Sequence, residues 1–384
     1  MLPGEHGLPE AIFALDGQIV NRLFVTLSRE ADQRLGCRLK EHLQILQLVW
    51  FGKHRQDLHC PTCSSQSLIR KGWRERTIKT SRGSFRLLVL QARCRNCGRT
   101  FRPWNNLLGL PRSRRVLEEL EAKAVFLGTQ VSFARSASIL KHLTCGTVSA
   151  EGIRQKIAEQ SQKIQLPTPQ EGETVLVDST KVKAGSKERG VPIYLAITAR
   201  PGPYKSNRPT CDKQLLHIHV GAAEPLKNHL RQLMPEYLVH DGGDSMEDCA
   251  KHVQRCRWHL GYQLKHYLWQ DGIPHHNRPP FHEALMDIMN DRGNGPQRYL
   301  KLANNLATCG LKTTAGHLLN AAPEAFTFLK EPGFSYIDTS PLEREMRELN
   351  RRVDVGARWS PSGVENLLKV LFHQRLNETT KGQL

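Results

Sequence analysis

Long apolar runs are missing from this chain of 384 residues. No stretch of roughly 18 apolar residues occurs, so we expect no membrane-spanning helix. Residues 1–17 contain no basic region followed by an apolar stretch, so we expect no secretion signal either. These two absences predict a cytoplasmic protein that makes no contact with a membrane.

Acidic residues are few relative to basic ones. The 37 Asp and Glu residues face 55 Lys and Arg residues, which leaves a formal net charge of +18. An excess of this size indicates an anionic partner, either a phosphate backbone or an anionic membrane. Without a membrane signal, the charge favours nucleic acid and a nucleoid-associated location, and the alternative is a basic surface that binds nothing.

A disulfide framework is also missing. Ten cysteines are present, but four of them form two Cys-x-x-Cys pairs and the other six are scattered. In a chain without a signal peptide, this pattern indicates a metal site plus free thiols. The paired residues are Cys60, Cys63, Cys94 and Cys97. Four thiolates suit tetrahedral Zn²⁺ and leave no open position for catalysis, so we predict a structural zinc.

The segment between the cysteine pairs predicts how they meet. Strand-like runs at 77–80 and 85–90 flank a short turn, which indicates a hairpin. We therefore expect a zinc-ribbon-like domain over 58–104 that needs its metal to fold. The alternative is a redox dithiol or a set of unrelated surface cysteines.

Helical patterns flank the cysteine-rich segment on both sides. An N-terminal helical segment, 1–57, carries no recognisable chemistry. An all-α region over 105–165 has the outline of a helix-turn-helix, with Ser132 as a helix N-cap and a last helix from about residue 150. That last helix would present Arg154 and Lys156 to a DNA groove. The alternative is a plain helical hairpin that fills a core.

Beyond a Pro-containing linker at 166–169, the pattern becomes strand-like. Three apolar or β-branched runs, one helix-like stretch and a fourth run follow one another. They lie at 174–178, 193–198, 215–220, 224–234 and 237–241. This order is the opening order of an RNase H-like fold. We therefore predict an α/β domain over 170–384 with a mixed sheet and a helical insertion at about 261–335.

Two aspartates end apolar strands of this domain. Asp178 follows the first run, and Asp241 closes the fourth. A strand core disfavours a charge, so an acid in that position needs partners or a metal. Carboxylate oxygens are the ligands that Mg²⁺ prefers. The alternative for each acid alone is a helix cap or a turn, since Asp241 precedes two glycines.

A third carboxylate is expected from the helix at 342–352. Glu343, Glu345 and Glu348 are the candidates there. Spacing alone cannot choose among them, because 343 and 345 point to different faces while 345 and 348 share one.

Four motifs in order resemble Mutator-type bacterial insertion-sequence transposases, over about residues 170 to 365. They are Asp178-Ser179-Thr180-Lys181-Val182-Lys183, His240-Asp241-Gly242, Cys256-Arg257-Trp258-His259 and Thr339-Ser340-Pro341-Leu342-Glu343-Arg344. The last motif selects Glu343. Two features depart from the family: Ser340 stands where Asn is usual, and the commonest members lack the zinc-binding head.

The resemblance implies a DDE transposase with an RNase H-like core. Asp178, Asp241 and Glu343 would hold Mg²⁺ (or Mn²⁺), cleave the element's ends and join the freed 3′-hydroxyl to target DNA by two-metal phosphoryl transfer. The partners would be the terminal repeats of the element and target DNA. Since two ends must be brought together, we expect a homo-oligomer on DNA.

Other residues receive secondary roles. Phosphate contacts are expected from Lys181, Lys183, Arg344 and Arg347. For Cys256 and His259 we expect a role in shaping the site or touching DNA, with half of a second zinc site as the alternative. For Trp258 we expect packing rather than base stacking.

Two rival functions stay open at this point. One is a non-catalytic DNA-binding protein built from the zinc and helix-turn-helix parts. The other is an RNase H-like nuclease that acts on branched DNA.

Overall fold

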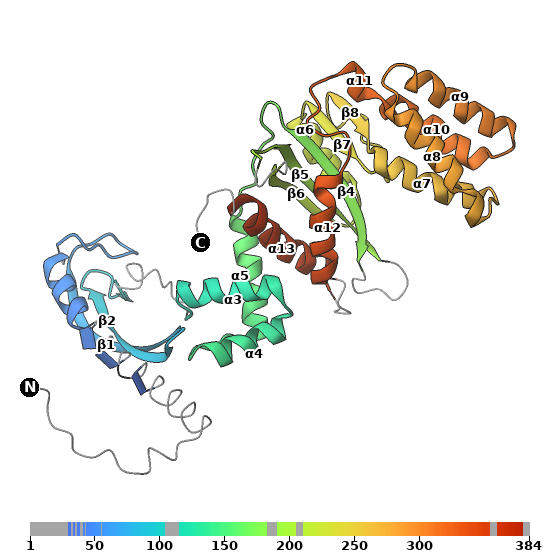
Figure 1. Cartoon of the computed structure of the whole chain (residues 1–384). Helices are drawn as coiled ribbons and strands as arrows, with labels where there is room; N and C mark the ends of the chain where they lie inside the picture. Colours follow the sequence, from blue (N-terminus) through green and yellow to red (C-terminus); the bar gives the residue numbers. More distant parts are fainter. Residues whose placement is uncertain are drawn as a thin grey trace, which may run out of the picture. The chain divides into compact units, whose positions relative to one another are not determined.

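The structure is a computed structural model with two compact units, Met1–Lys156 and Ile157–Leu384 (Figure 1). It describes residues 30–31, 34, 37–38, 41–42, 44–54, 56–103, 115–182, 190–204, 210–353 and 359–378. Most of the expected N-terminal helical segment, the stretch 104–114 and Lys183 lie outside these residues. Within the described part of the chain, no helix is both long and apolar enough to cross a membrane.

The first unit is built on a long antiparallel hairpin. Strand β1 (Leu68–Thr80) pairs with β2 (Gly83–Cys94), and β2 pairs with the short β3 (Thr100–Phe101). The predicted hairpin is confirmed, but its strands are much longer than the expected runs. Arginines interrupt the alternation of apolar and polar residues in the first half of β1. This half therefore does not have the sequence pattern of a strand.

One helical stretch, residues 44–54, lies along the outer edge of β2. The Gln47 side chain donates from Nε2 to the carbonyl of Leu88 at 3.0 Å and accepts at Oε1 from the N–H of Leu90, also at 3.0 Å. Phe51 packs beside it on Leu90 and Ala92. One amide side chain therefore supplies the hydrogen bonds that a neighbouring strand would make.

Three helices follow the hairpin: α3 (Glu118–Gln130), α4 (Phe133–Leu143) and α5 (Ala150–Lys163). The predicted N-cap is confirmed, since Ser132 accepts from the N–H of Arg135. The turn after α4 contacts the tip of the hairpin, where the Cys145 N–H donates to the Ser81 carbonyl at 2.8 Å. A Cβ on Gly146 would come within 2.2 Å of the Thr80 carbonyl, so only glycine fits there.

The second unit contains a five-stranded mixed sheet in the order β6-β5-β4-β7-β8. Its strands are β4 (Thr174–Val182), β5 (Val191–Pro201), β6 (Cys211–Val220), β7 (Tyr237–His240) and β8 (His252–Arg255). β4, β5 and β6 are antiparallel neighbours, whereas β4, β7 and β8 run parallel. The expected strands are all present, and β8 is an additional one.

Helices cover both faces of this sheet. On one face, Val175 and Val177 of β4 pack with Leu226 and Leu230 of α6 (Glu224–Leu233). Side chains alternate along a strand, so the even-numbered residues of β4 point to the other face. There α12 (Ser340–Val353) packs on β4, and α13 (Pro361–Phe372) packs on β6, followed by the π-helical turn His373–Glu378.

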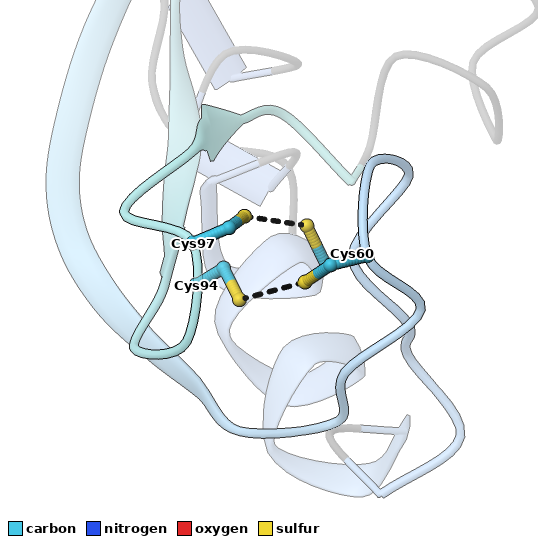
Figure 2. Close-up of side chains that lie close together, drawn as sticks. Cys60, Cys94 and Cys97 are labelled. Carbon is cyan, nitrogen blue, oxygen red and sulfur yellow. Dashed lines mark hydrogen bonds between the residues drawn. The ribbon is translucent and has the colours of Figure 1, made fainter.

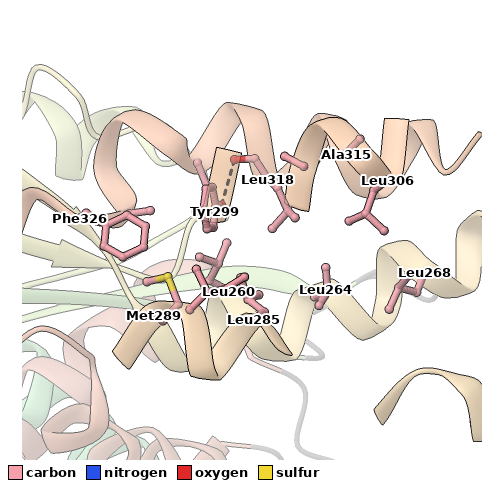
Figure 3. Packing of buried hydrophobic residues seen from close by; sticks show 14 residues of the cluster. Leu260, Leu264, Leu268, Leu285, Met289, Tyr299, Leu306, Ala315, Leu318 and Phe326 are labelled. Atoms are coloured by element: carbon pink, nitrogen blue, oxygen red, sulfur yellow. Dashed lines mark hydrogen bonds between the residues drawn. The ribbon is translucent and has the colours of Figure 1, made fainter. Parts of the chain in front are cut away.

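The chain between β8 and α12 forms a helical insertion with its own core (Figure 3). It contains α7 (Arg257–Gln270), the 3₁₀ turn His275–Asn277, α8 (Pro279–Asn290), α9 (Gly295–Thr308), α10 (Lys312–Ala325) and α11 (Thr327–Lys330). Leucines of α7 share one core with leucines of α8, α9 and α10, and each contributes about 2 kcal/mol when fully buried. The buried Tyr299 hydroxyl donates to the Leu318 carbonyl at 2.9 Å. Helices therefore occupy most of the range 261–335.

Candidate functional site

The four paired cysteines meet at the base of the β1–β2 hairpin. Their sulfur atoms all lie within 4.8 Å of one another. Cys60 Sγ is 3.6 Å from Cys97 Sγ (Figure 2). Cys63 Sγ is 3.6 Å from Cys94 Sγ. A Zn–S bond of 2.3 Å places the corners of a tetrahedron about 3.8 Å apart, close to these distances. The cluster could therefore hold a structural zinc ion, as predicted.

The two pairs share one backbone geometry. The residue after each second cysteine adopts a left-handed conformation, Ser64 with φ 55° and Gly98 with φ 70°. In both turns that residue donates its N–H to the carbonyl of the first cysteine, at 2.9 Å for Ser64 and 3.0 Å for Gly98. Two matching knuckles thus present their thiols to one point.

The thiols differ in how easily they ionise. Burial opposes ionisation of Cys60, but the N–H groups of Thr62 and Cys63 outweigh it and lower the pKa of Cys60 to about 6. At Cys97, a hydrogen bond from the Arg99 N–H favours the thiolate. Burial and the neighbouring sulfur atoms oppose it more strongly and raise the pKa of Cys97 to about 12. A full set of four thiolates therefore requires a cation, and Zn²⁺ fits this donor set.

Asp178 and Asp241 lie side by side on the parallel strands of the second unit. The last paired residues of β4 and β7 are Val177 and His240, and each aspartate follows directly. Ser179 joins them, since its N–H donates to Asp178 Oδ1 at 2.8 Å and its hydroxyl donates to Asp241 Oδ2 at 2.8 Å. The prediction that Asp178 ends its strand is wrong, because β4 continues to Val182 along β5; only the parallel pairing stops there.

Asp178 is a buried acid among like charges. Burial has the largest effect on the pKa of Asp178, and the negative charges of Asp241 and Glu343 add to it. Together they raise this pKa to about 8. The N–H of Ser179 only partly offsets these effects. Glu343 lies in the first turn of α12. Its negative charge, like that of Asp241, raises the pKa of Asp178.

The structure separates the three glutamates of α12. Glu345 is only 4% exposed and pairs with Lys213 at 3.3 Å and Arg375 at 3.1 Å. Glu348 pairs with Arg351 at 2.7 Å. Glu343 is the glutamate whose charge acts on Asp178.

Cys256 and His259 begin α7 and join it to the start of α12. Thr339 donates its N–H to Cys256 Sγ at 3.3 Å, and its hydroxyl lies 3.2 Å from His259 Nδ1. His259 Nε2 is 3.9 Å from Asp178 Oδ1. Burial lowers the pKa of His259 and outweighs the opposing charges of Asp241 and Glu343. The pair thus contacts both the carboxylate site and the helix that carries Glu343.

Among the described residues, the cysteine cluster is the one group of three or more His, Cys, Asp or Glu side chains close enough together to hold a metal ion. Cys256 and His259 have no such group around them. The three acids do not form one either, although they interact through hydrogen bonds and charge.

The residues expected to contact DNA lie in different environments. Lys181, Arg344 and Arg347 are exposed, on β4 and α12. Arg154 is exposed and bonded to Glu151. Lys156, by contrast, is mostly buried in an ion pair with Glu121 at 3.6 Å.

Sequence reasoning missed a buried polar group behind Asp241. His240 Nε2 lies 2.9 Å from Glu324 of α10, and Arg255 Nε lies 3.4 Å from the same carboxylate. The Arg255 guanidinium occupies the space where Gly242, at φ 89°, would carry a Cβ. An uninterrupted apolar run that ends in His240 gave a signal for a buried histidine, but nothing in the sequence pointed to Glu324 as its partner.

A scan of the sequence against protein-family models finds no match, and a search of curated proteins finds no match either.

Proposed function

We propose that this protein is a metal-dependent DNA transposase whose catalytic carboxylates are Asp178, Asp241 and Glu343. The observation that carries the proposal is the convergence of these acids. Two follow the last paired residues of adjacent parallel strands, and the third comes from a helix packed on the same strand. An acid whose pKa is raised by burial and then by like charges is typical of a functional site.

The strand arrangement supports an RNase H-like fold for the second unit. Three antiparallel strands, a helix and two strands parallel to the first give the order β6-β5-β4-β7-β8. The helical insertion enters after β8 and returns at α12, so that Glu343 arrives late in the chain beside the two aspartates. This is the layout that the sequence motifs imply.

DNA binding is supported by the charge of the chain and by its first unit. A net charge of +18 favours a phosphate-rich partner. The α4–α5 pair has the order of a helix-turn-helix, and Arg154 is exposed on α5. We assign recognition of the element's ends to this region, and the structural zinc to the stability of the adjoining hairpin.

The donor set of the carboxylate site fits Mg²⁺ or Mn²⁺, since all three groups offer hard oxygen ligands. Bound there, the metal would supply Lewis-acid activation and would neutralise charge at the phosphodiester. Burial and the charges of Asp241 and Glu343 raise the pKa of Asp178, and a bound cation would offset the repulsion among the three acids.

The neighbouring residues would hold these groups and the DNA in place. Ser179 fixes the two aspartates through its N–H and hydroxyl. The exposed Lys181, Arg344 and Arg347 would contact phosphates. Burial lowers the pKa of His259, which disfavours a positive charge on the ring beside the carboxylates.

The test is a donor–target assay with purified full-length protein. The labelled donor carries the DNA that flanks the coding sequence on each side, and the target is a supercoiled plasmid. We expect Mg²⁺-dependent nicking at the donor ends and joined donor–target products. Asp178→Asn, Asp241→Asn and Glu343→Gln should lose both while still binding the ends, and Glu348→Gln serves as the control on the same helix.

The outcomes separate the rival functions. Cleavage of branched DNA without joined products would indicate a nuclease. End binding without any cleavage by the wild-type protein would indicate a non-catalytic DNA-binding protein.

A further inference from the structure

The exposed face of α7 is a stripe of aromatic rings. Trp258, Tyr262, His266 and Trp269 follow one another at steps of four, four and three residues, which places them on one side of the helix. Trp258 is 48% exposed, Tyr262 62% and Trp269 58%, and His266 is exposed as well. The packing expected for Trp258 is with the neighbouring rings of His259 and Tyr262, and much of its surface stays in solvent. A solvated helix face normally carries charged and polar residues, so this stripe calls for a binding role.

The opposite face of α7 anchors the helix in the core of the insertion. Leu260, Leu264 and Leu268 are fully buried in the core of the insertion (Figure 3). The stripe lies outside this core. It lies on a rigid support, which is the arrangement that a binding surface requires.

The rings of the stripe are ordered against one another. Trp258 and Tyr262 are stacked, with centroids 5.3 Å apart and planes only 5° from parallel. The ring centroids of His266 and Trp269 lie 5.5 Å apart, and Gln270 Nε2 lies 3.0 Å from His266 Nε2. These contacts restrict the rings, so a flat ligand would bind with little loss of side-chain entropy.

The stripe begins at the carboxylate site. The Trp258 ring meets the His259 ring edge-on, with centroids 4.8 Å apart, and His259 Nε2 is 3.9 Å from Asp178 Oδ1. From Trp258 to Trp269 the stripe extends about 16 Å along the helix. That length matches roughly five stacked nucleotides of one DNA strand.

We propose that this aromatic stripe binds unpaired nucleotides of the DNA strand that leaves the carboxylate site, by stacking on their bases. This inference rests on the proposed function, which supplies DNA as the substrate. Stacking on aromatic side chains accepts any base and operates where bases are unpaired, whereas duplex DNA hides its base faces. The basic chain favours a nucleic-acid occupant over a protein one, and Lys265 on the same helix adds a cation beside the rings.

The test compares affinities of the full-length protein for one labelled oligonucleotide as a single strand and as a duplex. Fluorescence anisotropy is measured with zinc present and magnesium omitted, so that no cleavage occurs. The preference for the single strand is the readout, because basic surfaces elsewhere bind both forms. An oligonucleotide with abasic positions, which keeps its phosphates, should lose this preference for the wild-type protein.

Each ring should contribute measurably. Trp258→Ala, Tyr262→Ala and Trp269→Ala should each reduce the single-strand preference by about fivefold or more. Trp258→Phe keeps a ring and should retain most of it. Tyr204→Ala is the matched control, because Tyr204 is 76% exposed in the same unit but follows β5 rather than lying on α7.

The proposal is overturned if all three alanine variants keep the wild-type preference. It is also overturned if they instead change the oligomeric state in gel filtration, since the stripe would then be a protein interface. Trp269 is the decisive position, because it lies at the far end of α7 and its loss leaves the carboxylate site intact.

Failure here is distinguishable from failure of the proposed function. Asp178→Asn should abolish cleavage and leave the single-strand preference unchanged. If the wild-type protein never cleaves DNA but the alanine variants lose the preference, the stripe binds single strands and the transposase proposal fails. If cleavage and joining proceed and the alanine variants bind as the wild type does, the transposase proposal stands and the stripe has no such role.

Discussion

Thr339 donates its backbone N–H to the sulfur of Cys256, which lies 83 residues earlier in the chain, at a distance of 3.3 Å. The Thr339 hydroxyl is also 3.3 Å from the same sulfur and 3.2 Å from His259 Nδ1. The first residues of α7 and of α12 are thereby joined. Glu343 lies four residues after Thr339, about one helical turn, so this joint fixes where Glu343 stands.

Thr339→Val should therefore impair the chemistry more than the fold. Valine keeps the shape and the backbone N–H but removes the hydroxyl that contacts Cys256 and His259. We expect metal-dependent DNA cleavage to fall at least about tenfold, as for other residues that orient metal ligands. Single-turnover cleavage rates over a range of Mg²⁺ concentrations measure the effect, and Thr339→Ser should restore the rate. Equal loss in both variants would contradict a role for the hydroxyl.

The two glutamates at the start of α12 should respond in opposite ways. Glu345→Gln leaves Lys213 and Arg375 without their shared buried carboxylate and should lower the free energy of unfolding by about 3 kcal/mol. Glu343→Gln removes a charge that repels Asp178, so stability should not fall, while cleavage should fall at least about a hundredfold. Urea denaturation and cleavage rates on both variants check this pair. Full cleavage in Glu343→Gln would show that Glu343 is not the third catalytic carboxylate.

Zinc should be a stoichiometric component of the first unit. Elemental analysis is expected to find one zinc ion per chain, and Cys94→Ser should lose it and unfold the hairpin. Cys309→Ser is the matched control, because Cys309 is exposed and lies in the other unit. Retention of zinc in Cys94→Ser would contradict the four-thiolate site.

Asp178→Asn should stabilise the metal-free protein at alkaline pH. Burial and the charge of Asp241 raise the pKa of Asp178 from 3.8 to about 8, so the folded state binds this proton more tightly than the unfolded state. The free energy of unfolding should then decrease as pH rises from about 4 to about 8. Asparagine has no proton to lose, so the variant should exceed the wild type by roughly 1 to 3 kcal/mol at pH 8 and by little at pH 4.

Thermal unfolding at several pH values, with zinc present and magnesium absent, measures this difference. Added Mg²⁺ should stabilise the wild type and not the variant. A difference between the two proteins that does not change with pH would contradict a titrating Asp178.

The local features of the sequence predicted local structure well. The two Cys-x-x-Cys pairs gave the cysteine cluster, and the apolar runs before Asp178 and Asp241 gave two strands. Ser132 was correctly identified as a helix cap. The strand and cap signals each lie within a few neighbouring residues, whereas the two cysteine pairs, which are 31 residues apart, were joined through their shared metal-binding chemistry and the hairpin between them.

Long-range polar partners could not be predicted in this way. Glu324 pairs with His240, 84 positions away, and Glu345 is neutralised by residues of β6 and of the final helical turn. The short strand β8 reads His-Val-Gln-Arg and contains one apolar residue, so no apolar run marks it in the sequence. Such features depend on how distant segments pack, and no residue spacing encodes them.

The Gln47 side chain has a consequence for the behaviour of the protein in solution. The outer edge of a sheet offers free N–H and carbonyl groups to any other strand, and proteins avoid aggregation by covering such edges. At Leu88 and Leu90, one glutamine occupies those groups. At these two residues the hairpin is thereby protected from pairing with a strand of another chain.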